Sequence, residues 1–199
     1  MLKLFIILFA IVLSGCNTNQ NPRVIISTEA GDIELELYVD KAPITASNFL
    51  MYVDSGKYNN LASFYRVVRL DNQTDKPIKI EVIQGGFCED SLIEKYQFPP
   101  IRHETTAMTG ILHKDGVISM ARYDPGTASS EFFICVGDQP ELDCGGKRNP
   151  DNAGFAAFGK VIRGMDIVRK IQSMKDKDQF LVKPVRIMNV KRLVTYSDK

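Results

Sequence analysis

Three polar side chains stand out because each interrupts or borders an apolar run with the composition of a buried strand. Arg66 lies inside Phe64–Val68, Gln84 ends an apolar run before a glycine pair, and Glu131 precedes two aromatic residues. An arginine stays charged and offers several hydrogen-bond donors, so such a set could hold a polar group against an apolar surface. The other interpretation of Arg66 is a salt-bridged residue of the scaffold.

Other kinds of chemistry lack their motifs. His103 and His113 are ten positions apart, which does not match a zinc-binding helix, and no Cys pair has C-x-x-C spacing. No G-x-S-x-G is present, and Gly145-Gly146-Lys147 lacks the flanking residues of a P-loop. We therefore expect no metal and no cofactor. His113 is expected to be a surface or capping residue, and His103 is assigned no functional role.

The composition describes an ordinary globular chain of 199 residues with 44% hydrophobic residues. Its net charge of +1 gives no reason to expect nucleic-acid binding. At this length the chain holds one domain, with or without a short appendage.

Strands dominate the elements that must position these side chains. Alternating or continuous apolar runs predict strands at 24–26, 31–37, 64–68, 78–84, 117–121, 131–136, 155–161 and 185–194. Helices are predicted from Pro43 to a C-cap at Gly56, with an apolar stripe of Ala46, Phe49, Leu50 and Val53, and over Met165–Ser173. This set favours a mainly β fold, a closed eight-stranded antiparallel β-barrel capped by two α-helices.

Five ordered blocks of the sequence resemble the cyclophilin family of peptidyl-prolyl cis-trans isomerases. The blocks are Phe64–Val68 (FYRVV), Val82–Gly86 (VIQGG), Ile118–Ala121 (ISMA), Ser130–Ile134 (SEFFI), and Ala157–Val161 (AFGKV) continuing to Val168. The similarity extends from Arg23 to Tyr196. It implies a cyclophilin-like fold and an enzyme that rotates X-Pro peptide bonds without a cofactor.

The resemblance also implies roles for individual residues. The catalytic set would be Arg66, Gln84 and Phe133. Arg66 would donate to the proline nitrogen, Gln84 would fix Arg66, and Phe133 would form the floor of a proline pocket. The remaining substrate-binding residues would be Val82, Ala121, Arg122, Glu131, Leu142 and Phe155.

Several positions depart from the family pattern. Glu81 aligns with a pocket phenylalanine and Val82 with a methionine, so we expect a smaller and more polar pocket wall. Glu131 replaces a common glutamine, and Glu141 stands where well-known members carry the tryptophan that contacts cyclosporin, which predicts weak cyclosporin binding. Two segments, 69–77 and 138–154, are longer than usual and are expected to be loops beside the site.

The N-terminus predicts a lipid anchor. Leu4–Leu13 is an apolar run too short to span a bilayer, and it leads into Leu13-Ser14-Gly15-Cys16, which resembles the bacterial lipobox. We predict a signal peptide over 1–15, a tether lipidated on Cys16 over 16–22, and the cyclophilin-like domain over 23–199. The mature side-chain charge would be 25 − 1 − 24 = 0. The expected location is the periplasmic side of the cell envelope, in the outer membrane rather than the inner.

Two functions remain open at this level. One is an isomerase that assists folding of envelope proteins by acting on their proline-containing segments. The other is a non-catalytic peptide-binding chaperone or scaffold that uses the same groove. We expect a monomer. A disulfide between Cys88 and Cys144 is possible, and Cys135 is expected to be a buried thiol.

Overall fold

The computed structural model describes residues 21–193, so the predicted signal peptide, Cys16 and most of the tether lie outside the described residues. Its strands are β1 (Arg23–Thr28), β2 (Gly31–Leu37), β3 (Ser63–Val68), β4 (Val82–Gly86), β5 (Val117–Met120), β6 (Phe132–Cys135), β7 (Ala156–Arg163), β8 (Asp176–Lys177) and β9 (Phe180–Leu193). Its helices are α1 (Pro43–Asp54), α2 (Asp90–Tyr96), α3 (Thr106–Thr109), α4 (Met165–Gln172) and a 3-10 turn over Pro140–Leu142.

Eight of the strands form a closed antiparallel barrel. The strand order is β1-β2-β7-β5-β6-β4-β3-β9, and β9 pairs with β1 to close the ring. Strand β8 is a two-residue arm that pairs only with β9. Closure leaves no exposed edge along the ring, and the predicted fold class is confirmed.

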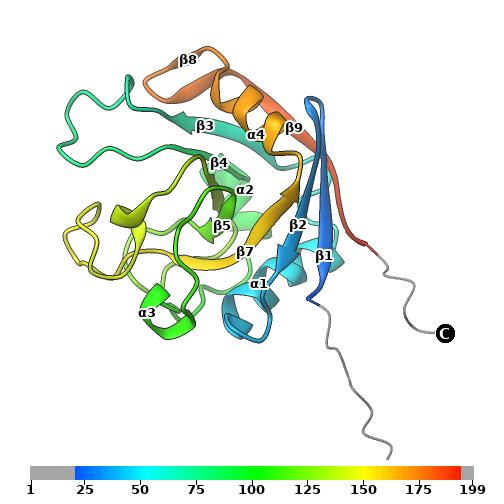
Figure 1. The fold of residues 1–199 in the computed structure, drawn as a ribbon. Helices are drawn as coiled ribbons and strands as arrows, with labels where there is room; N and C mark the ends of the chain where they lie inside the picture. The colour runs from blue at the N-terminus through cyan, green and yellow to red at the C-terminus, as the bar shows by residue number, and fades with distance from the viewer. Residues whose placement is uncertain (1–20, 194–199) are drawn as a thin grey trace, which may run out of the picture.

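The two predicted helices close opposite ends of the barrel (Figure 1). Helix α1 packs on β7 and β9, and α4 packs on β2, β3 and β4. Proline at the start of α1 suits the first helical turn, and the carboxylate of Glu104 accepts from the backbone N–H groups of Ile44 and Thr45 at 3.2 and 2.8 Å. The short helices α2 and α3 were not predicted, because a helix of one or two turns shows too little periodicity.

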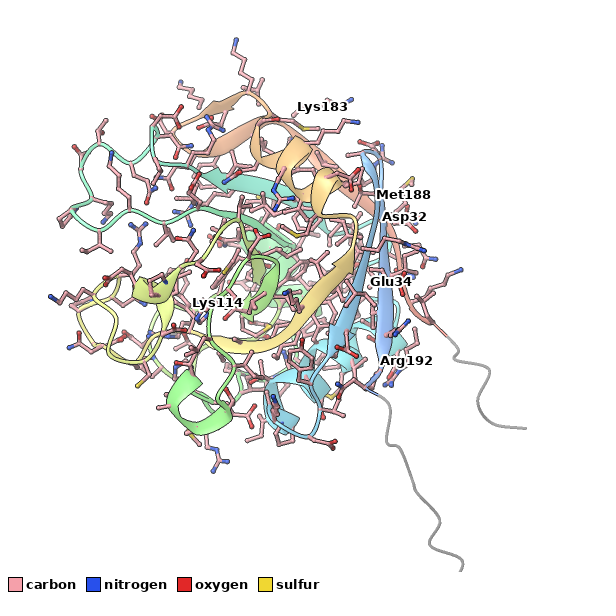
Figure 2. The ribbon with its side chains drawn as sticks, in the orientation of Figure 1. Asp32, Glu34, Lys114, Lys183, Met188 and Arg192 are labelled. Carbon is pink, nitrogen blue, oxygen red and sulfur yellow. The ribbon has the colours of Figure 1, made fainter. Side chains whose placement is uncertain are left out.

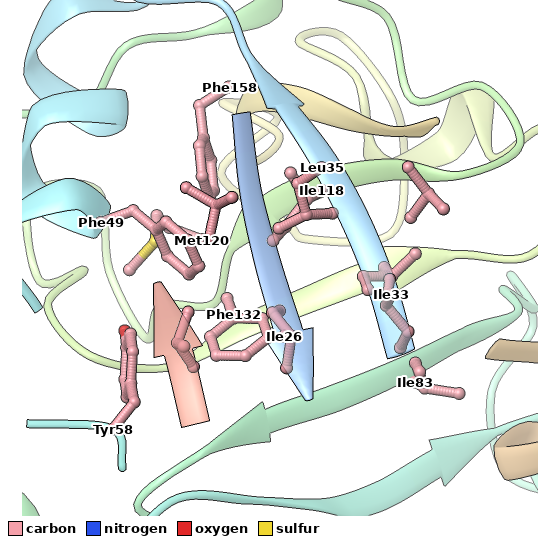
Figure 3. Packing of buried hydrophobic residues seen from close by; sticks show 14 of the residues in the cluster. Ile26, Ile33, Leu35, Phe49, Tyr58, Ile83, Ile118, Met120, Phe132 and Phe158 are labelled. Atoms are coloured by element: carbon pink, nitrogen blue, oxygen red, sulfur yellow. The ribbon is translucent and has the colours of Figure 1, made fainter. Parts of the chain in front are cut away.

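The barrel interior is filled by large apolar side chains. Figure 3 shows residues from strands and from α1 meeting there, among them Phe49, Ile83, Phe132 and Phe158. The rings of Phe49 and Phe132 meet edge to face at 5.4 Å between centroids. All four residues of the predicted stripe on α1 are buried, so the helix faces the barrel as its pattern indicates.

Charged side chains spread over the outside of the barrel (Figure 2). Arg192 of β9 pairs with Asp54 of α1 at 2.6 Å, and Glu34 of β2 pairs with Arg163 of β7 at 3.1 Å. The Arg192–Asp54 pair is exposed at both side chains, and exposed pairs add little stability. No helix within residues 21–193 has the length and apolar character that crossing a membrane requires.

Candidate active site

The predicted site residues gather on the outer face of the barrel, over β3, β4 and β6. Side chains alternate along a strand, so Ile83 and Phe132 point into the interior while Gln84 and Phe133 point outward. The register of β3 shifts between Phe64 and Arg66. A bulge of this kind re-aims side chains, and both Tyr65 and Arg66 consequently face the same outer cavity.

Two neutral amide groups hold the guanidinium of Arg66. Its Nη1 donates to Gln84 Oε1 at 2.9 Å, and its Nε and Nη2 donate to Gln179 Oε1 at 3.1 and 2.5 Å. Among the described residues Arg66 forms no ion pair, so the salt-bridge interpretation of this residue is wrong. Burial lowers the pKa of Arg66, yet a guanidinium remains charged at any physiological pH.

Gln179 reaches Arg66 because of the tight turn between β8 and β9. Asp178 and Gln179 are the two turn residues, and both have positive φ, +52° and +73°. That is the backbone of a two-residue hairpin turn, which usually takes asparagine and glycine. The backbone N–H of Val67 donates to Gln179 O at 2.8 Å, which docks the turn on β3.

A chain of hydrogen bonds leads from Arg66 across the site. An arginine can only donate, so Gln84 presents its oxygen to Arg66 and its Nε2 to the Tyr65 hydroxyl at 2.6 Å. Tyr65 then donates to Glu131 Oε2 at 2.6 Å. The side chain of Gln84 is therefore fixed at both ends.

Glu131 lines the cavity, but its carboxylate is engaged by the protein. Its Oε1 accepts from the backbone N–H of Phe87 at 2.8 Å and from Ser130 Oγ at 3.2 Å. Burial raises the pKa of Glu131, and burial likewise raises the pKa of Tyr65. A Cβ on Gly86, whose φ is +146°, would collide with this carboxylate, which explains why a glycine ends β4.

An apolar pocket adjoins these polar groups. It consists of Val68, Ile80, Val82, Phe133, Cys135 and Leu142, with Ala121 and Phe155 packed against it. The rings of Phe133 and Phe155 meet edge to face at 5.2 Å. The predicted floor and walls are thus brought together in one place.

The prediction that Glu81 makes the pocket wall more polar is wrong. The half-buried Glu81 turns toward α4, where its Oε1 accepts from Gln172 Nε2 at 3.5 Å. Ile80 occupies the wall instead, because residues of an extended chain alternate in direction and Ile80 shares the outward side of Val82. The pocket therefore stays apolar despite the acidic residue in the aligned position.

His113 is fully buried, contrary to the surface or capping role expected for it. Its Nδ1 bonds Asp143 Oδ1 at 2.7 Å, its Nε2 bonds Ser119 Oγ at 3.0 Å, and its ring stacks on Phe133 at 5.9 Å. The order Asp-His-Ser matches that of a hydrolase triad. Ser119 is completely buried, however, so the set supports the floor of the pocket and has no access to a substrate.

Arg122 presents only its backbone to the cavity. Its side chain is entirely buried, pairs with Asp151 through two hydrogen bonds of 2.8 and 2.9 Å, and lies over the Phe155 ring. Ala121 continues the strand pairing by donating to Glu131 O at 2.8 Å. Both residues suit a groove wall that meets a substrate backbone.

The two long loops form the far rim of the cavity, as expected. Lys76 from the first loop and Arg148 and Asn149 from the second line a cavity of about 820 Å³. Arg148 Nη1 donates to Gln73 Oε1 at 2.9 Å and to the Ile78 carbonyl oxygen at 2.5 Å, so the loops are joined to each other.

The three cysteines within residues 21–193 form no disulfide. Cys88 and Cys144 are free and exposed, and Cys135 is free and buried as expected. Cys88 lies at the edge of the cavity, where burial raises the pKa of its thiol.

The sequence did not identify Gln179, Tyr65 or Ile80 at this site, and it placed Arg148 only within a loop beside the site. Tyr65 and Ile80 are neighbours of residues that were identified; the bulge of β3 decides the direction of Tyr65, and Ile80 shares the outward side of Val82. Gln179 and Arg148 come from a turn and a loop, and nothing in their local sequence indicates which residue they meet.

Known proteins resemble this chain over most of its length. The family model described as cyclophilin type peptidyl-prolyl cis-trans isomerase/CLD matches residues 23–192. A peptidyl-prolyl cis-trans isomerase of Acinetobacter baylyi is 39% identical over 87% of this chain and 84% of its own length. Peptidyl-prolyl cis-trans isomerase A of Dickeya dadantii is 36% identical over 88% and 83%. A Cryptosporidium parvum cyclophilin-type isomerase structure superimposes with a TM-score of 0.69 at 23% identity, over 88% of this chain and 99% of that one.

Proposed function

The chain belongs to the cyclophilin-type peptidyl-prolyl cis-trans isomerases, and from this premise we propose that Arg66 supplies the catalytic hydrogen bond in the apolar pocket described above. The enzyme class follows from the family. The observation that carries the role of Arg66 is its position, a charged donor held by two amides at the edge of a pocket floored by Phe133.

The isomerisation of an X-Pro bond neither forms nor breaks a covalent bond. Rotation about an X-Pro bond is slow because it breaks amide resonance, with a barrier of about 18–20 kcal/mol. As the bond twists, the lone pair localises on the proline nitrogen and becomes a better hydrogen-bond acceptor. A donor that meets this nitrogen is bound more strongly in the twisted state than in the planar one, which is the condition for catalysis.

Arg66 retains donors for this purpose. A guanidinium has five N–H donors, and the structure engages three of them with Gln84 and Gln179. Two are left for a substrate within the described part of the chain. Gln84 and Gln179 carry no charge, so they orient the guanidinium without neutralising it.

The proline ring would sit on Phe133. Val82, Leu142 and Phe155 pack around Phe133 and would exclude water from the bound proline ring. Burying the apolar ring holds the segment in place, while the polar groups along β3 and β4 meet its backbone. Ala121 and the backbone of Arg122 form the opposite wall.

The test compares Arg66→Ala with Arg186→Ala in a protease-coupled assay on an X-Pro peptide. Arg186 is an exposed arginine of β9 that pairs with Glu29, away from the cavity. We expect Arg66→Ala to lower kcat/KM by about 100- to 1000-fold, the usual cost of removing one transition-state donor. Arg186→Ala should match the wild type.

Circular dichroism would show that both variants fold. Full activity in a folded Arg66→Ala protein would overturn the role of Arg66. Retained peptide binding without any turnover in the wild type would favour the peptide-binding chaperone or scaffold instead.

The proposal extends to the place of action, on proline-containing segments of envelope proteins. Cys16 in its lipobox-like context supports a lipid anchor, preferentially in the outer membrane. Strand β1 starts on the side of the barrel away from loops 69–81 and 138–154 (Figure 1), so a tether ahead of Arg23 would leave the cavity open. Acyl chains contribute about 0.8 kcal/mol per buried methylene, enough to hold the protein at a membrane.

Palmitate labelling in bacteria tests the anchor. The full-length chain should incorporate label and sediment with outer membranes, and Cys16→Ala should do neither. Cys144→Ala, which removes an exposed thiol of the folded domain, is the matched control. Labelling that survives Cys16→Ala would contradict the anchor.

A further inference from the structure

Arg148 is held inside the cavity by the contact between the two long loops. Its Nη1 bonds both Gln73 Oε1 and the Ile78 carbonyl oxygen, and these two acceptors come from the loop that leads into β4. The residue is half-buried and lines the same cavity as Arg66. Its position is therefore defined by the fold, unlike that of a free surface arginine.

The positive charge of Arg148 has no partner of opposite sign in residues 21–193 as the structure describes them. Its hydrogen-bond partners, an amide oxygen and a carbonyl oxygen, are neutral. Both guanidinium groups line the same cavity, and burial and the charge of Arg66 lower the pKa of Arg148. Lys76, which is exposed, lines the same cavity.

Arg122 offers a contrast within the same cavity. Its charge is matched by Asp151 at 2.8 Å, and its side chain is buried. The buried charge of Arg122, which has a structural role, is thus neutralised by a carboxylate. Arg66 and Arg148 receive neutral oxygens instead, so both retain their attraction for an anion that enters the cavity.

The cavity is also polarised along β4. Glu131 lies at the Gly86 end of that strand, where it bonds Tyr65, while Arg148 lies before its Val82 end. With a rise of about 3.3 Å per residue, β4 alone separates the two ends by about 13 Å. Consider an extended substrate segment that runs along β4 with its proline on Phe133. The residue two or three positions from that proline would then lie at the basic end, near Arg148.

We propose that Arg148 forms a subsite for an acidic side chain, so that the enzyme prefers proline segments carrying Asp or Glu close to the proline. The inference rests on the proposed function, because it assumes that the segment binds with its proline on Phe133. The carboxylate would accept from the donors of Arg148 that Gln73 and Ile78 leave unused.

The experiment measures kcat/KM for peptides that differ by Glu or Gln at one position, scanned over the residues that flank the X-Pro pair. At one position we expect the Glu peptide to be preferred by about three- to ten-fold, as for a half-buried ion pair. Arg148→Gln should reduce this ratio to about one. Lys191→Gln, which removes an exposed charge of β9 outside the cavity, should leave the ratio unchanged. At about 1 M salt, where the screening length is about 3 Å, the ratio should fall.

A binding measurement separates this proposal from the proposed function. Calorimetry on the same Glu and Gln peptides reports the subsite even if turnover is absent. A Glu preference that Arg148→Gln abolishes supports the subsite. Equal binding of both peptides at every position, or a preference that persists in Arg148→Gln, overturns it. If Arg66→Ala loses turnover while the wild type shows no Glu preference, the proposed function is supported and the subsite is refuted.

Discussion

The barrel interior and the outer pocket are built from the same strands but are stabilised differently. Phe132 and Phe133 are neighbours on β6, yet the first packs among interior rings, whereas the second belongs to the outer apolar pocket and lines the cavity. Ile83 and Gln84 divide in the same way on β4. The interior is held mainly by apolar packing, with a few buried hydrogen bonds such as that from the Tyr58 hydroxyl to the Ser130 carbonyl oxygen at 2.7 Å, whereas the pocket combines a small apolar cluster with a network of polar side chains.

The difference shows which part of the molecule can change without loss of the fold. Interior side chains are close-packed on all sides, so each substitution there acts on stability. The pocket opens on solvent, and its polar groups are held by loops and by one tight turn. Substitutions there should act on binding and catalysis first. The following predictions test this separation.

The largest expected effect distinguishes the two adjacent phenylalanines. Phe132→Ala should lower the free energy of unfolding by about 3–5 kcal/mol, because it leaves a cavity among interior rings. Phe133→Ala should cost less stability, because water can enter the space, but should lower kcat/KM by about 10- to 100-fold through lost apolar contact with proline. Urea unfolding and the isomerase assay measure the two effects. Equal losses of stability would show that pocket and interior act as one core.

The next prediction concerns Gln179. Its positive φ of +73° is unfavourable for a residue with a Cβ, so Gln179→Gly should leave stability unchanged or raise it by about 1 kcal/mol. The same change removes the oxygen that holds Arg66 Nε and Nη2, and we expect kcat to fall by about ten-fold with a smaller change in KM. Gln179→Asn keeps an amide but has a shorter side chain, so its kcat should be almost as low as that of Gln179→Gly.

Thermal unfolding and steady-state kinetics on Gln179→Gly and Asp178→Gly check this prediction. Asp178 shares the turn and has a positive φ of +52°, but it does not contact Arg66 in the structure. Asp178→Gly should therefore relieve the same kind of strain without affecting kcat. A similar fall in kcat for both variants would mean that turn rigidity matters and the Gln179 amide does not.

The smallest expected effect is the pH dependence that Glu131 adds to stability. Burial raises the pKa of Glu131 in the folded state, so the folded protein binds more protons than the unfolded chain above the ordinary glutamate pKa of about 4.3. Stability from this group is present below that pH and is lost as the pH rises through the folded-state pKa. Glu131→Gln should remove this loss, because an amide does not titrate.

The measurement is the free energy of unfolding of both proteins between about pH 4 and pH 7. As the pH rises, the free energy of unfolding of the Glu131→Gln protein should increase relative to that of the wild type. Glu94, an exposed carboxylate of α2, provides the control variant Glu94→Gln. A wild-type advantage that grows with pH would mean that the Tyr65, Ser130 and Phe87 hydrogen bonds outweigh burial.

Much of the site could be predicted because its residues lie on strands with distinctive sequences. Arg66, Gln84 and Phe133 come together as expected, since β3, β4 and β6 are adjacent in the barrel. The errors fall where direction or burial depends on distant contacts. Glu81 turns away from the pocket toward Gln172 of α4, and His113 is buried because Asp143, thirty positions later, satisfies its ring nitrogen.

The sequence by itself determined the barrel, its two end helices and the outward or inward direction of most strand residues, because the period of a strand and of a helix is a local property of the chain. Only the tertiary structure decided how Arg66 is held and what surrounds the pocket. Gln179 lies 113 positions from Arg66 and Arg148 lies 75 from Gln73. Side-chain hydrogen bonds between such distant positions depend on how loops dock on the finished barrel, which no local pattern encodes.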